Sequence, residues 1–248
     1  MAEEIMVSVV VPTFNERENV GILCERVDAA LEGVEHEIIF VDDSSDDTPK
    51  IIAQIQENKP HVRAYHRENK TGLATAVIDG FGLAKGRYLA VMDADLQHPP
   101  EILKPMYAAI TAEECDFCIP SRFIAGGSDG GLNLYRKFVS ATARYIGKAM
   151  LSSIRRVSDP TGGLFMFRRE CIEGADLRPI GWKILIEVLA MAKYDSICEI
   201  PYTFCQREHG ESKLSAKVTK EYLQQVLLLR KREIRRKQVR VVRIRPEK

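Results

Sequence analysis

Short apolar runs alternate along the first half of the chain with segments whose apolar residues recur at helical spacing. The sequence predicts strands at 5–11, 37–41, 62–66, 88–92 and 115–120, and the apolar runs at 37–41, 88–92 and 115–120 are expected to be buried. The helical spacing predicts helices at about 16–31, from 48 onward, at 71–84 and at 100–112. Strands that alternate with helices are typical of a doubly wound α/β sheet with helices on both faces.

The apolar run from Tyr88 to Met92 ends in two acids, Asp93 and Asp95. On an extended chain, residues two apart point to the same side, so both carboxylates can face one point. Gln97 adds a third oxygen if the chain stays extended. Such a donor set suits a hard divalent cation, Mg²⁺ or Mn²⁺, and the ligand crevice of an open α/β sheet lies at these strand ends. The competing interpretation is that the acids only form a helix-capping turn.

The second half of the chain contains a basic segment. No acid occurs from Gly130 to Ser158, whereas six arginines and lysines do. A helix expected at about 133–152 is therefore basic and amphipathic, which is typical of binding to an anionic membrane surface. The alternative is an ordinary solvated helix packed on the body. The same periodicities predict further strands at 164–167 and 196–204, and helices at 183–191 and 216–236.

Charge is distributed unevenly, although the formal net charge is only +1. Residues 230–248 carry +8 and the remaining residues carry −7, so an acidic body precedes a basic tail. The tail attracts anionic surfaces, unless it is only a solvated arm. It lacks a recognised nucleic-acid module and interleaved aromatics, which disfavours nucleic acid as a partner.

The chain has features of a protein that works in the cytoplasm. Its six cysteines are scattered, and Met1-Ala-Glu-Glu4 is an acidic start unlike a secretory signal. No apolar run reaches the roughly 18 residues of a membrane span. We expect a reducing, cytoplasmic setting.

Six motifs together resemble the family 2 glycosyltransferases, and among them the polyprenyl-phosphate sugar transferases such as the dolichol-phosphate mannose synthases. In chain order these motifs are Val11-Pro-Thr-Phe-Asn-Glu16, Val41-Asp-Asp-Ser-Ser45, Met92-Asp-Ala-Asp-Leu-Gln97, Ser121-Arg122, Asp159-Pro-Thr-Gly162 and Gly210-Glu-Ser-Lys213. The resemblance covers roughly residues 5–230. It implies a GT-A-like doubly wound mixed sheet, with a catalytic domain at 1–229 followed by the basic tail.

The resemblance also implies roles for individual residues. The nucleoside contacts are expected at Pro12, Phe14, Glu16, Val41 and Asp43. The metal ligands are expected at Asp93, Asp95 and Gln97, which with Ala94 and Lys183 also line the nucleotide-sugar site. Contacts to the donor and acceptor phosphates are expected from Arg122, Arg207 and Lys213, which with Asp95 form the expected catalytic set. Phe14 stands where many relatives have tyrosine, which keeps stacking but removes a hydroxyl contact.

The activity implied is a metal-dependent, inverting transfer of mannose from GDP-mannose to dolichyl phosphate. UDP-glucose is the alternative donor, and a catalytically inactive nucleotide-binding subunit is a further alternative. The residues agree with phosphate as the nucleophile, because a phosphate monoester has a second pKa near 6 and needs no strong general base. Many relatives carry C-terminal membrane helices. The resemblance therefore implies a peripheral position on the cytoplasmic face of a membrane, with an anchor supplied either by partner subunits or by a segment outside this sequence.

Overall fold

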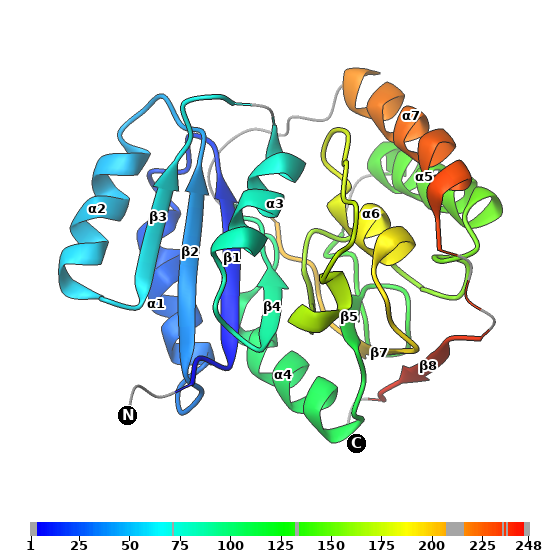
Figure 1. Cartoon of the computed structure of the whole chain (residues 1–248), viewed down its shortest axis with the longest axis horizontal. Helices are drawn as coiled ribbons and strands as arrows, with labels where there is room; N and C mark the ends of the chain where they lie inside the picture. The colour runs from blue at the N-terminus through cyan, green and yellow to red at the C-terminus, as the bar shows by residue number, and fades with distance from the viewer. Residues whose placement is uncertain are drawn as a thin grey trace.

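The computed structural model describes residues 4–70, 72–131, 134–206, 216–234, 236 and 238–245 (Figure 1). The strands are β1 (Val7–Thr13), β2 (His36–Asp42), β3 (Val62–His66), β4 (Tyr88–Val91), β5 (Phe117–Ser121), β6 (Phe165–Arg168), β7 (Ser196–Pro201) and β8 (Arg240–Arg243). The α-helices are α1 (Val20–Ala30), α2 (Thr48–Asn58), α3 (Leu73–Leu83), α4 (Leu103–Ala112), α5 (Leu134–Met150), α6 (Ile184–Met191) and α7 (Ala216–Arg232). Two short 3₁₀ helices are η1 (Pro100–Ile102) and η2 (Arg169–Ile172).

The described strands form one mixed sheet in the order β3-β2-β1-β4-β6-β5-β7-β8. Every pair is parallel except the two pairs made by β6, which runs antiparallel to β4 and to β5. The predicted α/β class, with a mixed sheet between helices, is confirmed. Because β1, β2, β4 and β5 are parallel, their carboxyl ends lie along the same edge of the sheet.

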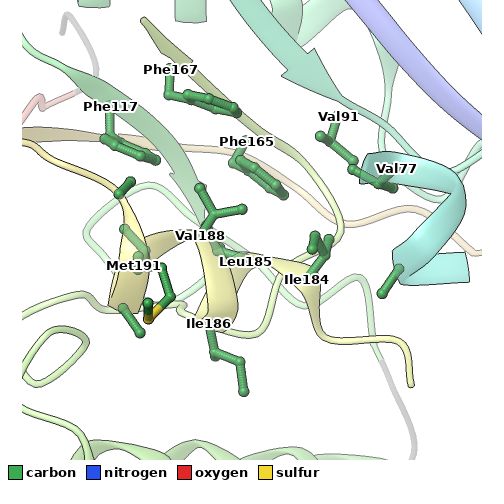
Figure 2. Close-up of a cluster of buried hydrophobic side chains, with 14 of the residues drawn as sticks. Val77, Val91, Phe117, Phe165, Phe167, Ile184, Leu185, Ile186, Val188 and Met191 are labelled. Carbon is green, nitrogen blue, oxygen red and sulfur yellow. The ribbon is translucent and has the colours of Figure 1, made fainter. Parts of the chain in front are cut away.

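Helices cover both faces of the sheet, and the strands β1, β4 and β5 are fully buried, whereas the edge strand β3 is exposed from Ala64 to His66. Leu89 and Val91 of β4 face α3 and α6, in the cluster that Figure 2 shows around Phe165 and Phe167. Tyr88 and Ala90, which alternate with them, face the cluster of α1, α2 and α4. Apolar residues fill both faces of β4, and the strand direction therefore fixes where the acids after it emerge.

The C-terminal region is folded onto the body in the part that the structure describes. The hydroxyl of Tyr222 on α7 donates to the carbonyl of Ala143 on α5 at 2.6 Å, and Val226 and Leu229 are buried. The helices α5 and α7 lie side by side in Figure 1 and contact each other. Within the segment expected to be a basic tail, α7 ends at Arg232, and β8 pairs in parallel with β7.

Candidate active site

The chain after β4 does not stay extended, although the expected alignment of Asp93, Asp95 and Gln97 on one side requires it. The strand ends at Val91, and Ala94 and Asp95 lie in a turn. Leu96 has a positive φ of 58°, and the N–H of Gln97 donates to Oδ1 of Asp95 at 3.1 Å. The extended geometry proposed for these acids is therefore wrong, because an Asx-type turn reverses the backbone there. The turn is not a helix cap either, since η1 begins only at Pro100.

Cys205 holds the far side of this turn. Its N–H donates to the carbonyl of Gln97 at 2.8 Å, and the side-chain amide of Gln97 donates to the carbonyl of Cys205 at 3.4 Å. Two residues before Cys205, Thr203 forms an isolated parallel β-bridge with Ser128. The segment after β7 thus orients Gln97 relative to Asp95.

The loop 159–163, which carries the Asp-Pro-Thr-Gly motif, lies against Asp93. A methyl group at Gly163 would overlap Oδ2 of Asp93, so only glycine fits there without displacing that carboxylate. The carbonyl of Thr161 in the same loop accepts a hydrogen bond from Nζ of Lys183 at 2.9 Å. This loop therefore connects an acid after β4 with a lysine at the start of α6.

Arg122, at the end of β5, forms a paired contact with the first residue of that loop. Its Nε and a terminal nitrogen donate to the two carboxylate oxygens of Asp159 at 2.7 and 3.0 Å. The side chains are 9% and 0% exposed. Burial by itself would lower the pKa of Arg122, but the hydrogen bonds and charge of Asp159 outweigh it and raise that pKa. The guanidinium stays charged and fixed in direction.

Two buried groups complete the electrostatics of the site. Burial and the charge of Arg122 lower the pKa of Lys183, while Asp93 and Asp159 act in the opposite direction. His98 is 3% exposed, and burial with the nearby cations lowers its pKa to about 3, so it is neutral at physiological pH. Two cations, Arg122 and Lys183, therefore lie close enough to the acids to interact with them.

His98 was not foreseen as a site residue. Its Nε2 lies 3.8 Å from Oδ2 of Asp93, and its Nδ1 lies 3.1 Å from the hydroxyl of Tyr202 after β7. Asp159 was recognised only as part of a motif, without a role. Both residues adjoin or begin a sequence motif, since His98 follows Gln97 and Asp159 opens the Asp-Pro-Thr-Gly motif. Their positions along the chain do not predict that they lie near Asp93.

The loops after β1 and β2 form the other half of this edge. The N–H groups of Asn15 and Glu16 donate to Ser44 Oγ at 2.8 Å and to Thr48 Oγ1 at 3.0 Å. Thr48 is the first residue of α2, directly after the N-cap residue Asp47. Phe14 is 45% exposed beside these contacts. An exposed ring on a fixed loop is suited to stacking on a flat ligand.

Asp43, the expected nucleoside contact after β2, is held by an arginine that the sequence did not single out. Arg67 is 4% exposed, and its guanidinium donates to both carboxylate oxygens of Asp43 and to Asp79. Pro12, Val41 and Ala94 are buried in the structure. Arg67 therefore fixes the direction of the Asp43 carboxylate, which does not depend on a bound ligand alone.

Two expected phosphate contacts, Arg207 and Lys213, lie outside the described residues. The remaining expected residues lie in three groups along the carboxyl edge. The first loops carry Pro12, Phe14, Glu16, Val41 and Asp43, the turn after β4 carries Asp93, Ala94, Asp95 and Gln97, and the β5 and α6 ends carry Arg122 and Lys183. The donor set of the middle group is made of hard oxygens, which fits Mg²⁺ or Mn²⁺.

A basic pocket of about 580 Å³ adjoins the end of β5. It is lined by Phe123 and, among others, by the cationic side chains of Arg144, Lys148, Arg243 and Arg245. The guanidinium of Arg144 lies 3.7 Å from the ring centroid of Phe123. Burial and the charge of Arg144 lower the pKa of Lys148. The pocket is therefore suited to an anionic group.

The described helices include none that is both long enough and apolar enough to cross a bilayer.

The chain is similar in sequence to a family of glycosyl transferases and to proteins named mannosyltransferases. The family model described as "Glycosyl transferase family 2" matches residues 8–174. A dolichol-phosphate mannosyltransferase of Pyrococcus furiosus is 44% identical over 227 residues, which cover 92% of this chain and 64% of that relative. The chain thus spans a little under two thirds of that relative's length. A dolichol-phosphate mannosyltransferase of Saccharomyces cerevisiae is 37% identical over 232 residues, covering 88% of this chain and 85% of the relative.

Solved structures share the fold. Glucosyl-3-phosphoglycerate synthase of Mycobacterium tuberculosis, in complex with Mn²⁺, UDP and phosphoglyceric acid, aligns with a TM-score of 0.65 at 20% identity. The alignment covers 91% of this chain and 78% of that one. The complex of the same synthase with UDP gives a TM-score of 0.64 at 19% identity, over 91% and 80% of the two chains. At this identity the likeness establishes the fold alone.

Proposed function

We propose that this chain, which belongs to glycosyl transferase family 2, transfers mannose from GDP-mannose to dolichyl phosphate with inversion at the anomeric carbon. The observation that carries the proposal is the arrangement at the carboxyl edge, where Asp93 lies between the Asp159 loop and the turn that carries Asp95. The cations Arg122 and Lys183 face the same region. The names of the similar proteins guide the choice of donor and acceptor.

The reaction forms one bond and breaks another. An oxygen of the acceptor phosphate attacks the anomeric carbon, and the bond from that carbon to the nucleoside diphosphate breaks, with its electron pair leaving on the diphosphate. A phosphate monoester is largely deprotonated at neutral pH, so no side chain must remove a proton. Attack opposite the leaving group inverts the anomeric carbon.

The chain's own residues bind and neutralise the phosphates in this proposal. Asp93, Asp95 and Gln97 would hold Mg²⁺ or Mn²⁺, which when bound supplies positive charge to the leaving diphosphate. Arg122, fixed by Asp159, binds the acceptor phosphate together with Arg207 and Lys213, and Lys183 adds charge beside the donor. Nε2 of His98 lies 3.8 Å from Oδ2 of Asp93, and its low pKa of about 3 keeps His98 neutral at physiological pH.

On the opposite half of the edge, Phe14 stacks on the nucleoside base, and Glu16 and Asp43 accept its hydrogen bonds, between the buried residues Pro12 and Val41. Asp43 is held in place by Arg67, and the loop contacts to Ser44 and Thr48 fix the backbone under Phe14.

In the same proposal, the protein binds as a peripheral protein to an anionic membrane surface on the cytoplasmic side. The basic pocket beside α5 and the acid-free segment 130–158 support this position. Leu227 and Leu228 on α7 are 56% and 47% exposed next to the basic residues that end this helix. Exposed apolar residues flanked by cations are typical of interfacial helices.

The test is transfer of radiolabelled sugar from GDP-mannose and, separately, from UDP-glucose to a short polyprenyl phosphate with Mg²⁺ or Mn²⁺. We expect transfer from GDP-mannose and at least tenfold slower transfer from UDP-glucose. Faster transfer from UDP-glucose would overturn the donor but keep the reaction class. Absence of transfer from either donor, with vesicles present, would overturn the reaction.

A further inference from the structure

Three side chains converge at the edge of the sheet opposite the candidate active site. Asp28 lies in the second half of α1, His36 is the first residue of β2, and His61 directly precedes β3. Oδ1 of Asp28 lies 3.1 Å from Nε2 of His36 and 2.8 Å from Nε2 of His61. All three atoms lie within 4.8 Å of one another, and we call these residues the Asp28 cluster.

The hydrogen bonds of His36 point its second nitrogen at the cluster. Nδ1 of His36 lies 2.8 Å from the carbonyl of Val34, which can only accept a hydrogen bond. A ring whose Nδ1–H donates to this carbonyl presents Nε2 to the carboxylate of Asp28. A backbone carbonyl behind the distal nitrogen is the usual arrangement of a metal-binding histidine. Nε2 of His36 and Oδ1 of Asp28 therefore face each other, and both are ligand atoms that suit a transition-metal ion.

The other oxygen of Asp28 is held by a lysine. Nζ of Lys59 lies 2.6 Å from Oδ2 of Asp28 and 3.0 Å from Glu25. Oδ1 therefore remains directed at the two imidazoles. The two acids and the lysine sum to a charge of −1, which favours a bound cation.

The distances are close to those of a tetrahedral site. Metal bonds of about 2.0–2.1 Å place neighbouring ligand atoms about 3.4 Å apart, so the two Oδ1–Nε2 distances of 3.1 and 2.8 Å would widen by roughly 0.3–0.6 Å. Imidazole with one carboxylate suits Zn²⁺ and its transition-metal neighbours rather than Mg²⁺. The side chain of His61 is 32% exposed, which leaves room for water as the fourth ligand.

We propose that the Asp28 cluster binds one Zn²⁺-type transition-metal ion through Asp28, His36 and His61, with water as the fourth ligand. This site is separate from the acids after β4, because it lies at the amino ends of β2 and β3 and presents nitrogen donors. The ion joins α1 to the starts of two strands, and its role is to stabilise this half of the sheet.

The experiment is a Zn²⁺ titration of the full chain after treatment with chelator, followed by calorimetry and thermal unfolding. We expect the wild type to bind one equivalent of Zn²⁺ at this cluster. In His61→Ala the affinity for this equivalent should fall roughly 100-fold or more. At about 100 times its Kd, Zn²⁺ should raise the Tm of the wild type by roughly 5–10 °C. His66→Gln is the matched control, because His66 lies at the opposite end of β3, and it should keep this equivalent.

Equal Zn²⁺ binding and an equal Tm shift in wild type and His61→Ala would overturn the proposal. A second readout does not depend on the folding of a variant. In ¹⁵N spectra of wild-type imidazoles, saturating Zn²⁺ should shift Nε2 of His36 and of His61. If both Nε2 atoms stay protonated under saturating Zn²⁺, the cluster is an ion pair only, and the metal site is wrong.

Discussion

The guanidinium of Arg122 donates two parallel hydrogen bonds to the carboxylate of Asp159, in a contact almost closed to solvent. Removing one partner of a buried pair leaves the other charge uncompensated. We expect Asp159→Ala to lower the free energy of unfolding by about 3–5 kcal/mol, measured by denaturant unfolding. Transfer should fall as well, since Arg122 loses its fixed direction.

An exposed pair serves as the control for Asp159→Ala. Asp176 lies 2.8 Å from Arg178, with both side chains more than half exposed. Asp176→Ala should leave the unfolding midpoint nearly unchanged, because solvent screens an exposed pair. A loss below about 1 kcal/mol in Asp159→Ala would show that the buried pair does not hold β5 to the 159–163 loop.

Gly163 provides a test of the position of Asp93. Gly163→Ala should reduce transfer at least tenfold, because the added methyl group displaces the Asp93 carboxylate. The neighbouring Gly162→Ala is the matched control, since its Cβ would lie 3.8 Å from the carbonyl oxygen of Asp159, an ordinary van der Waals contact. Steady-state rates of the two variants decide the matter, and similar rates would mean that Asp93 is not needed in its present position.

The acids after β4 should be required for the metal. We expect Asp93→Ala or Asp95→Ala to abolish transfer, because the charge of the diphosphate is then not neutralised. Excess EDTA should also stop the reaction, and added Mg²⁺ or Mn²⁺ should restore it. Glu173→Ala, an exposed acid after η2, should keep full activity. Full activity of the wild type in excess EDTA would rule out a metal at this site.

Glu37 should make stability depend on pH. Its carboxylate is 1% exposed and accepts from Ser8, from Arg63 and from the N–H of Lys85. Burial by itself would raise its pKa, but these hydrogen bonds outweigh burial and lower it. A lowered pKa means that ionised Glu37 stabilises the fold above its unfolded pKa of about 4.3 and stops doing so as pH falls through the folded value.

Glu37→Gln should therefore unfold more easily by about 1–3 kcal/mol at pH 7, and its difference from the wild type should shrink below pH about 4. Denaturant unfolding over a pH series measures this. Glu35→Gln, two residues away and exposed, should show little change at either pH. A Glu37→Gln deficit that stays constant down to the acid limit of folding would contradict the lowered pKa.

Membrane binding is better tested by charge substitution than by truncation. Removing residues 231–248 would also remove β8, whose backbone pairs with β7. We expect the intact chain to float with anionic vesicles at low salt, and Arg144→Gln/Lys148→Gln/Arg245→Gln to weaken binding roughly 100-fold, at about 1 kcal/mol per charge. Rising salt should release the protein.

The control for this substitution is Lys50→Gln/Lys104→Gln/Lys193→Gln, which removes the same charge from residues outside the basic pocket. It should float almost as the wild type does. If the intact chain stays in the soluble fraction on anionic vesicles at low salt, a partner or another segment must provide the attachment.

The sequence by itself determined most of the secondary structure, though not β8, and the edge at which the candidate site lies. The run at 88–92 became β4, because a strand buried on both faces needs uninterrupted apolar residues, and the segment 62–66 became the edge strand β3. Parallel strands place the polar residues that follow them at one edge. Asp43, Asp93 and Arg122 could therefore be assigned to the same edge without any knowledge of contacts.

Only the tertiary structure decided which side chains meet. The strand order that places β6 antiparallel between β4 and β5 depends on packing between residues about 75 positions apart, and local periodicity carries no record of it. The turn at Leu96, the overlap that requires Gly163 beside Asp93, and His98 under that acid follow from this packing. The Asp28 cluster likewise joins residues whose spacing along the chain matches no motif. Local sequence fixes backbone preference and burial, whereas side-chain contacts across elements depend on the free energy of the whole fold.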